Sequence, residues 1–196
     1  MARIPVKRSY LPLAIAGGFA LVLVIALTIV LWPKEIVPPS QQELAGDYAK
    51  GLQYQRGDGV TADYNQAIEW YRKAADGGYG QAEYALGLMT DAGHGVVRDE
   101  KAAIEWFRRA AEHDFAEAQV RLAGDLITGA ATADGKPDKI EALKWLQIGA
   151  ENMPDELSKQ IAITTRDKLY QEMTPDARTE ATHRANAWRK QHMPQR

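Results

Sequence analysis

A stretch of the chain that is copied once before and once after itself limits the possible folds more than any other feature. The central copy covers residues 81–116, and a shift of 36 residues places Trp70 of the preceding copy on Trp106. A third, looser copy contains Trp145, which follows Trp106 by 39 residues. A period in this range is typical of stacked helical units, each of which buries an apolar face against its neighbours.

Within the central copy, the pattern predicts two helices joined by a short turn. Residues 81–92 carry apolar side chains at helical spacing and precede Gly93, which suits a helix end that needs positive φ. Asp99 precedes the second helix, where its side chain can accept hydrogen bonds from unpaired backbone N–H groups. Gly87 and its counterpart Gly51 lie inside helices, so we expect them to let neighbouring helices approach closely. The same pattern predicts helices over residues 41–56, 63–76, 81–92, 100–112, 117–128 and 138–152.

The repeated positions carry a family resemblance. In the central copy they are Ala85-Leu86-Gly87, Gly93-x-Gly95-Val96, Asp99, Lys101-Ala102, Trp106-Phe107 and Ala110-Ala111. This set resembles the Sel-one-like repeat (SLR), a branch of the tetratricopeptide-repeat superfamily. The resemblance implies an all-α fold, a short right-handed α-solenoid of about three helix-turn-helix repeats, and a role in protein–protein interaction. It implies no particular ligand.

The N-terminus predicts a membrane anchor. Residues 11–32 hold 22 residues without a charge, which as a helix would reach about 33 Å, against a hydrocarbon core of roughly 30 Å. Residues 1–10 carry three basic residues and no acid, so the positive-inside rule places them in the cytoplasm and the repeats in the periplasm of a bacterial-type inner membrane. A cleaved signal peptide is the first alternative, but its apolar region would be shorter. Cytoplasmic repeats are the second.

After residue 152 the repeat pattern stops, and two further helix starts follow. They are Pro154-Asp155-Glu156 and Thr174-Pro175-Asp176. The apolar stripes predicted on these helices are Leu157, Ile161, Leu169 and Met173 on the first, and Ala177, Ala181, Ala185 and Trp188 on the second. A solenoid needs terminal elements that cover its last repeat, so we expect two capping helices.

These observations divide the chain into seven segments: a basic cytoplasmic N-terminus, a transmembrane anchor, a Pro-rich tether, three repeats and the C-terminal capping helices. Their bounds are 1–10, 11–32, 33–42, 43–80, 81–116, 117–152 and 153–196.

The inventory of reactive residues predicts no enzyme, cofactor or metal. Cysteine is absent, and the four histidines lack the spacing of a zinc motif. The glycine-rich turns at residues 57–59 and 93–95 follow no predicted strand, so they read as turns between helices. After residue 10 the chain has 26 acidic residues against 21 basic ones, since three of the 24 basic residues come earlier. Without a basic patch, nucleic acid is excluded as a partner.

The leading hypothesis is a membrane-anchored adaptor, an accessory or assembly subunit of a respiratory, secretion or cell-envelope complex. Its partners would be other membrane or periplasmic proteins, with the bilayer held through residues 11–32. Stacked helix pairs make a curved surface, with the first helix of each pair on the concave side. The candidate groove contacts are four polar residues of those helices that we expect to be exposed: Asp47, Lys50, Gln53 and Glu83. The alternative is a periplasmic recognition module for cell-wall glycan or peptide ligands.

Overall fold

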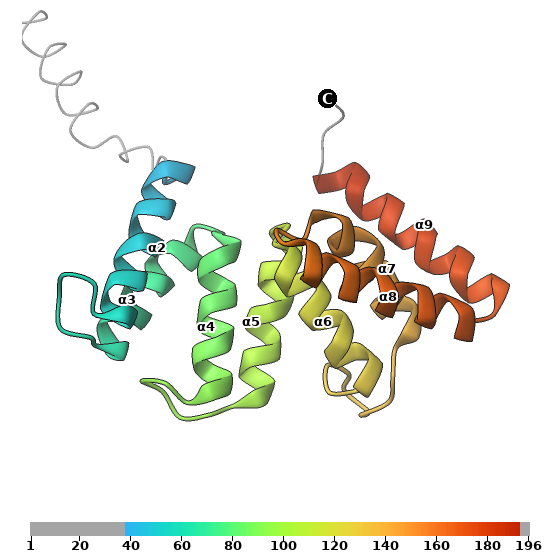
Figure 1. Cartoon of the computed structure of the whole chain (residues 1–196), viewed down its shortest axis with the longest axis horizontal. Coiled ribbons are helices and arrows are strands. Elements are labelled where there is room, and N and C mark those ends of the chain that lie inside the picture. Colours follow the sequence, from blue (N-terminus) through green and yellow to red (C-terminus); the bar gives the residue numbers. More distant parts are fainter. Residues whose placement is uncertain (1–37, 193–196) are drawn as a thin grey trace, which may run out of the picture. The chain divides into compact units, whose positions relative to one another are not determined.

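The computed structural model describes residues 38–192, and within that range the chain is entirely helical (Figure 1). The α-helices are α2 (Gln41–Arg56), α3 (Tyr64–Asp76), α4 (Gly80–Ala92), α5 (Glu100–Glu112), α6 (Ala116–Thr128), α7 (Lys139–Gly149), α8 (Glu156–Glu172) and α9 (Pro175–His192). A 3₁₀ helix, η1 (Ala150–Asn152), continues α7. The six helices predicted in the repeats are confirmed within one residue, except that the last ends as η1.

The predicted anchor, residues 11–32, lies outside the described residues. Among the helices of residues 38–192, none combines the length and the hydropathy that crossing a bilayer requires.

Aspartates begin the second helix of each repeat, as the sequence predicts. The side chain of Asp63 accepts from the Asn65 N–H at 2.9 Å, and that of Asp99 from the Ala102 N–H at 3.0 Å. Asp138 does the same at the start of α7. Gly93 ends α4 with φ of 73°, in the left-handed region that favours glycine. These local signals fix where each helix starts and stops.

The helices of the repeats pack in series, because each contacts the next from α2 to α7 (Figure 1). One cluster of buried side chains lies between α3 and α4, and it includes Tyr71 and Leu86. A second cluster extends from α5 through α7 into the C-terminal helices. The order of contacts is that of a helical solenoid, which confirms the predicted fold class.

Gly51 and Gly87 allow the two helices of a repeat to approach closely, as predicted. A Cβ added to Gly87 would lie 2.4 Å from Cε1 of Phe107, and one added to Gly51 would lie 2.4 Å from Cε1 of Tyr71. Both rings are fully buried. The glycines therefore make room for an aromatic ring that crosses from the second helix of each pair.

The last helix covers the last repeat. Helix α9 packs on α7, and it buries Ala181, Ala185 and Trp188. Rings of Trp145 and Trp188 meet edge to face with their centroids 5.7 Å apart. This confirms the predicted capping role of α9.

The stripe predicted on α8 is wrong at two positions. Leu157 is 73% exposed and Ile161 is 58% exposed, whereas Ala162, Leu169 and Met173 are buried. Helix α8 contacts α7 and η1, and these contacts turn a different side of the helix inward. The predicted helix is correct, but only part of its predicted buried face is.

Candidate functional site

The three polar side chains that are buried in residues 38–192 occupy the same position of each repeat. They are Asp47 on α2, Glu83 on α4 and Gln119 on α6, spaced 36 residues apart. Asp47 is 8% exposed, and the other two are fully buried. A buried charge or amide needs a polar partner elsewhere in the chain.

Glu83 lies at the centre of a clasp between helices. One carboxylate oxygen is 2.9 Å from a guanidinium nitrogen of Arg109, and the other is 2.6 Å from Nδ1 of His113. Arg109 also donates to the Ala75 carbonyl at the end of α3, at 3.2 Å. The carboxylate thus ties α4 to α5, while the guanidinium ties α5 back to the preceding repeat.

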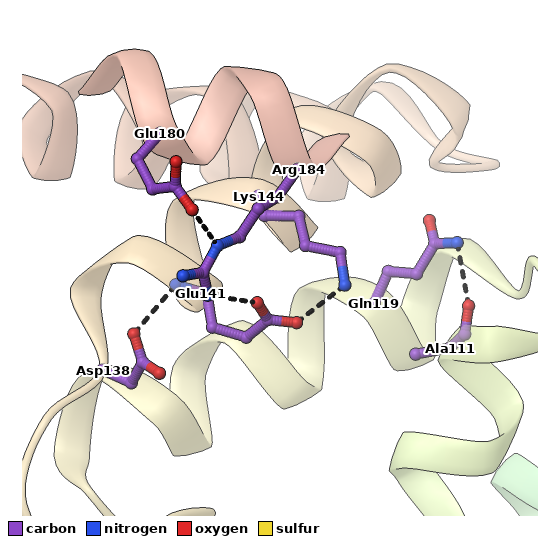
Figure 2. Close-up of polar contacts among 7 residues, drawn as sticks. All are labelled: Ala111, Gln119, Asp138, Glu141, Lys144, Glu180 and Arg184. Carbon is purple, nitrogen blue, oxygen red and sulfur yellow. Dashed lines mark hydrogen bonds and ion pairs between the residues drawn. The ribbon is translucent and has the colours of Figure 1, made fainter. Parts of the chain in front are cut away.

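The neighbouring repeats use the same position with different chemistry. Asp47 pairs with Lys73 at 3.0 Å, and Lys73 is 36 residues before Arg109. In the third repeat, the position that corresponds to Arg109 is Ile148. Gln119 there donates to the Ala111 carbonyl at 3.1 Å instead (Figure 2). We call these three arrangements the repeat clasps.

The clasps correct part of the predicted groove. We expected Asp47 and Glu83 to be exposed, and this is wrong, because both carboxylates point to the second helix of their own repeat. Lys50 and Gln53 are exposed as expected. The Nζ of Lys50 lies 4.2 Å from the centroid of the Trp70 ring. A role for Lys50 and Gln53 in binding a partner stays a prediction.

A charged face that the sequence analysis missed connects the first helices of the second and third repeats. Arg121 on α6 lies 3.2 Å from a carboxylate oxygen of Asp91 on α4 and 3.4 Å from one of Asp125. Burial raises the pKa of the Asp125 carboxyl, although Arg121 acts in the opposite direction. Leu88, one turn before Asp91, is 41% exposed. We call these four residues the α4–α6 face.

Figure 2 shows how the cap is joined to the third repeat. Arg184 on α9 lies 3.5 Å from a carboxylate oxygen of Glu141 on α7, and 2.7 Å from one of Glu180. Lys144 approaches the other oxygen of Glu141 at 2.7 Å. Most of these groups are partly exposed, so they orient α9 more than they stabilise it.

Hollows open on the described part of the chain. A cavity of about 600 Å³ lies between α5 and the turn after α6, and a cleft of about 340 Å³ lies between α7, α8 and α9. In the cleft, Arg166 is 2.9 Å from Asp167 and 3.8 Å from Glu151. These charges pair with one another. The first cavity is lined by both apolar and charged side chains.

No group of three metal-ligating side chains comes together within residues 38–192. Burial raises the pKa of Tyr71 and Tyr84. Tyr71 is buried in the first cluster, and Tyr84 packs against the second, with its ring centroid 5.4 Å from that of Phe107. The perturbed groups in this range therefore have structural explanations.

Comparison with protein families finds the Sel1 repeat three times, at residues 38–79, 80–115 and 116–152. A crystal structure of a Sel1 repeat protein from Oxalobacter formigenes superposes with a TM-score of 0.54 at 31% identity. That match covers 62% of this chain and 89% of the other. No curated protein matches this chain.

A second solved structure supports the fold alone. It is a protective antigen of uropathogenic Escherichia coli strains that displays an SLR fold, with a TM-score of 0.56 at 23% identity. The match covers 79% of this chain and 39% of the antigen.

Proposed function

Because this chain belongs to the Sel1 repeat family, we propose that it is a membrane-anchored adaptor whose repeats bind other proteins. The anchor would be residues 11–32, with the repeats in the periplasm. The partners would be subunits of an inner-membrane complex with respiratory, secretion or cell-envelope roles.

One observation carries the binding role. In each repeat, a buried polar side chain of the first helix is held by another part of the chain: Asp47 by Lys73, Glu83 by Arg109, and Gln119 by the Ala111 carbonyl. The side chains left over on the first helices, such as Lys50, Gln53 and Leu88, have exposed surface and no part in the clasps. Exposed polar and apolar groups side by side on a rigid helical scaffold suit protein recognition.

The anchor is supported by sequence. Residues 11–32 are long enough to span, and the basic residues precede them. A tether that includes Pro38 and Pro39 would hold the repeats near the bilayer as a semi-rigid spacer. A partner embedded in the same membrane would then meet the repeats at a high effective concentration.

Affinity purification of the full chain in mild detergent tests the proposal. We expect a membrane protein to co-purify in a fixed ratio. Recovery should fall in the variant Lys50→Glu with Gln53→Ala, and it should persist in Lys168→Glu, which changes an exposed residue of α8. Purification of the chain alone, with no membrane protein above background, would contradict the adaptor role.

Topology needs a separate assay. A C-terminal reporter that is active only outside the cytoplasm should be active in the full chain. It should lose activity when the three basic residues before residue 11 are replaced by acids. An inactive reporter on the intact chain would place the repeats in the cytoplasm and remove the periplasmic part of the proposal.

A further inference from the structure

The two junctions between successive repeats are built alike, except that the second lacks the two aromatic rings that the first contains. At the first junction, the turn after α4 packs on the beginning of α3. The rings of Tyr64 and His94 stack there, with centroids 4.9 Å apart and planes 6° from parallel. A Cβ added to Gly95 would lie 3.0 Å from Cδ1 of Ile68, so the turn touches the helix closely.

At the second junction, small or charged residues replace both rings. Glu100 stands 36 residues after Tyr64, and Ala130 stands 36 residues after His94. Ile104 keeps the place of Ile68 and is buried. The cavity of about 600 Å³ lies here, between α5 and the turn after α6. We call it the junction pocket.

The lining of the junction pocket suits an aromatic ring. Its apolar lining residues are Ala102, Ile104, Ala130, Ala131 and Ala133, of which Ile104 is buried. Its rim is charged, with Lys101, Glu105 and Arg108. Arg108 donates to the Ala131 carbonyl at 3.0 Å, which holds the turn in place while the pocket stays open. Cations beside apolar side chains favour the face of a ring, and a carboxylate can accept from a phenol hydroxyl.

We propose that the junction pocket binds a tyrosine side chain presented by a partner protein. The ring would lie beside Ile104, at the place that corresponds to the stacked pair Tyr64 and His94 of the first junction. Its hydroxyl would reach the charged rim. A buried aromatic anchor is the usual centre of a protein interface. This inference rests on the proposed binding function, and it names the contact chemistry.

The test uses N-acetyltyrosinamide as the probe and N-acetylalaninamide as its control. The full chain in detergent carries ¹³C-labelled isoleucine methyl groups, and the signal of Ile104 is followed by NMR. We expect a saturable shift with the tyrosine probe at millimolar concentration, and none with the alanine probe.

A filled pocket provides the decisive variant. Glu100→Tyr with Ala130→His reproduces the first junction, so the Ile104 signal should no longer respond to the probe. Glu156→Tyr with Ala92→His adds the same rings at exposed positions away from the pocket, and there the response should remain. If the double variant unfolds, Ala130→Phe alone fills the pocket and should also abolish the response.

Three results would overturn the proposal: no saturable shift in the parent chain, an equal shift with the alanine probe, or a filled variant that responds like the parent. The co-purification experiment is independent of them. A chain that captures its partner but ignores the tyrosine probe would refute the pocket and leave the adaptor role standing.

Discussion

The close approach of Gly87 to Phe107 gives the sharpest test of how these repeats are packed. In Gly87→Ala, the new Cβ would lie 2.4 Å from Cε1 and 2.6 Å from Cδ1 of a fully buried ring. Overpacking of this kind destabilises by about 1–3 kcal/mol. Against this, replacing a glycine inside a helix by alanine stabilises the helix by up to about 1 kcal/mol. We therefore expect a net loss of about 1–2 kcal/mol, since the ring has no free space to enter.

The third repeat shows how the chain itself avoids this clash. Ala123 stands 36 residues after Gly87, and Leu146, 39 residues after Phe107, replaces the ring. Both are buried. Phe107→Leu alone should cost about 1–2 kcal/mol through lost packing, less than a Phe→Ala change. In the double variant the methyl group enters the vacated space, so the loss should be smaller than the sum by about 1 kcal/mol.

Urea unfolding of the full chain in mild detergent, followed by circular dichroism, measures these differences. The control is Gly124→Ala on α6, an exposed position where an added Cβ meets nothing within 4 Å. It should stabilise by up to about 1 kcal/mol. Strict additivity of the two changes at Gly87 and Phe107, or a Gly87→Ala variant as stable as Gly124→Ala, would refute the packing argument.

Three further predictions concern the clasp, the cap and a partly buried acid. Glu83→Ala should lower the free energy of unfolding, measured by urea titration, by about 1–3 kcal/mol. This is less than the full cost of breaking a buried ion pair, because its partner Arg109 is 43% exposed. Glu83→Gln should lower the free energy of unfolding by less than Glu83→Ala. Trp188→Ala should cost about 3–5 kcal/mol, and hydrogen exchange should show α9 losing protection before α4. Asp125→Asn should stabilise the folded protein at pH 7. The pKa of the Asp125 carboxyl is raised in the folded state, so the ionised carboxylate is less favourable there than in the unfolded chain. The urea midpoints of variant and parent should converge as the pH falls to the ordinary range of aspartate pKa values.

Local signals in the sequence were enough to place the helices of the repeats. Asp63 and Asp99 predicted helix starts, and Gly93 predicted a helix end, because each acts on backbone groups a few residues away. The three additional residues of the third repeat fall in the turn before Asp138. An insertion in a turn changes few contacts, so the period survives it.

The burial of Glu83 could not be predicted from local signals of this kind. A lone glutamate on a helix usually faces water, and its burial depends on Arg109 and His113 lying 26 and 30 residues away. The signal that was present is the recurrence of a polar residue at 36-residue spacing, as Asp47, Glu83 and Gln119. Because two of these residues are acids and the third is an amide, the recurrence indicates a shared need for a hydrogen-bonding partner and not a shared charge.

The wrong face on α8 has a similar cause. Helical periodicity gives the angle between apolar residues, but an α-helix with several such residues offers more than one stripe. Leu157 and Ile161 formed one candidate, and the contacts with α7 and η1 instead buried Ala162. Which stripe becomes buried depends on the helices that pack against α8. Their positions follow from the whole fold and cannot be predicted from a local pattern.

The three repeats share some positions and differ at others. Positions that recur, such as the clasps and the ring opposite Gly87, are explained by contacts inside the chain. We therefore expect specific recognition to use the positions where one repeat departs from the next. Ala130 in place of His94 and Glu100 in place of Tyr64 are such departures, and Ala130 lines the cavity. If the repeats act as an adaptor, we expect the second junction to contribute to its specificity, because the first junction already holds the stacked rings of Tyr64 and His94.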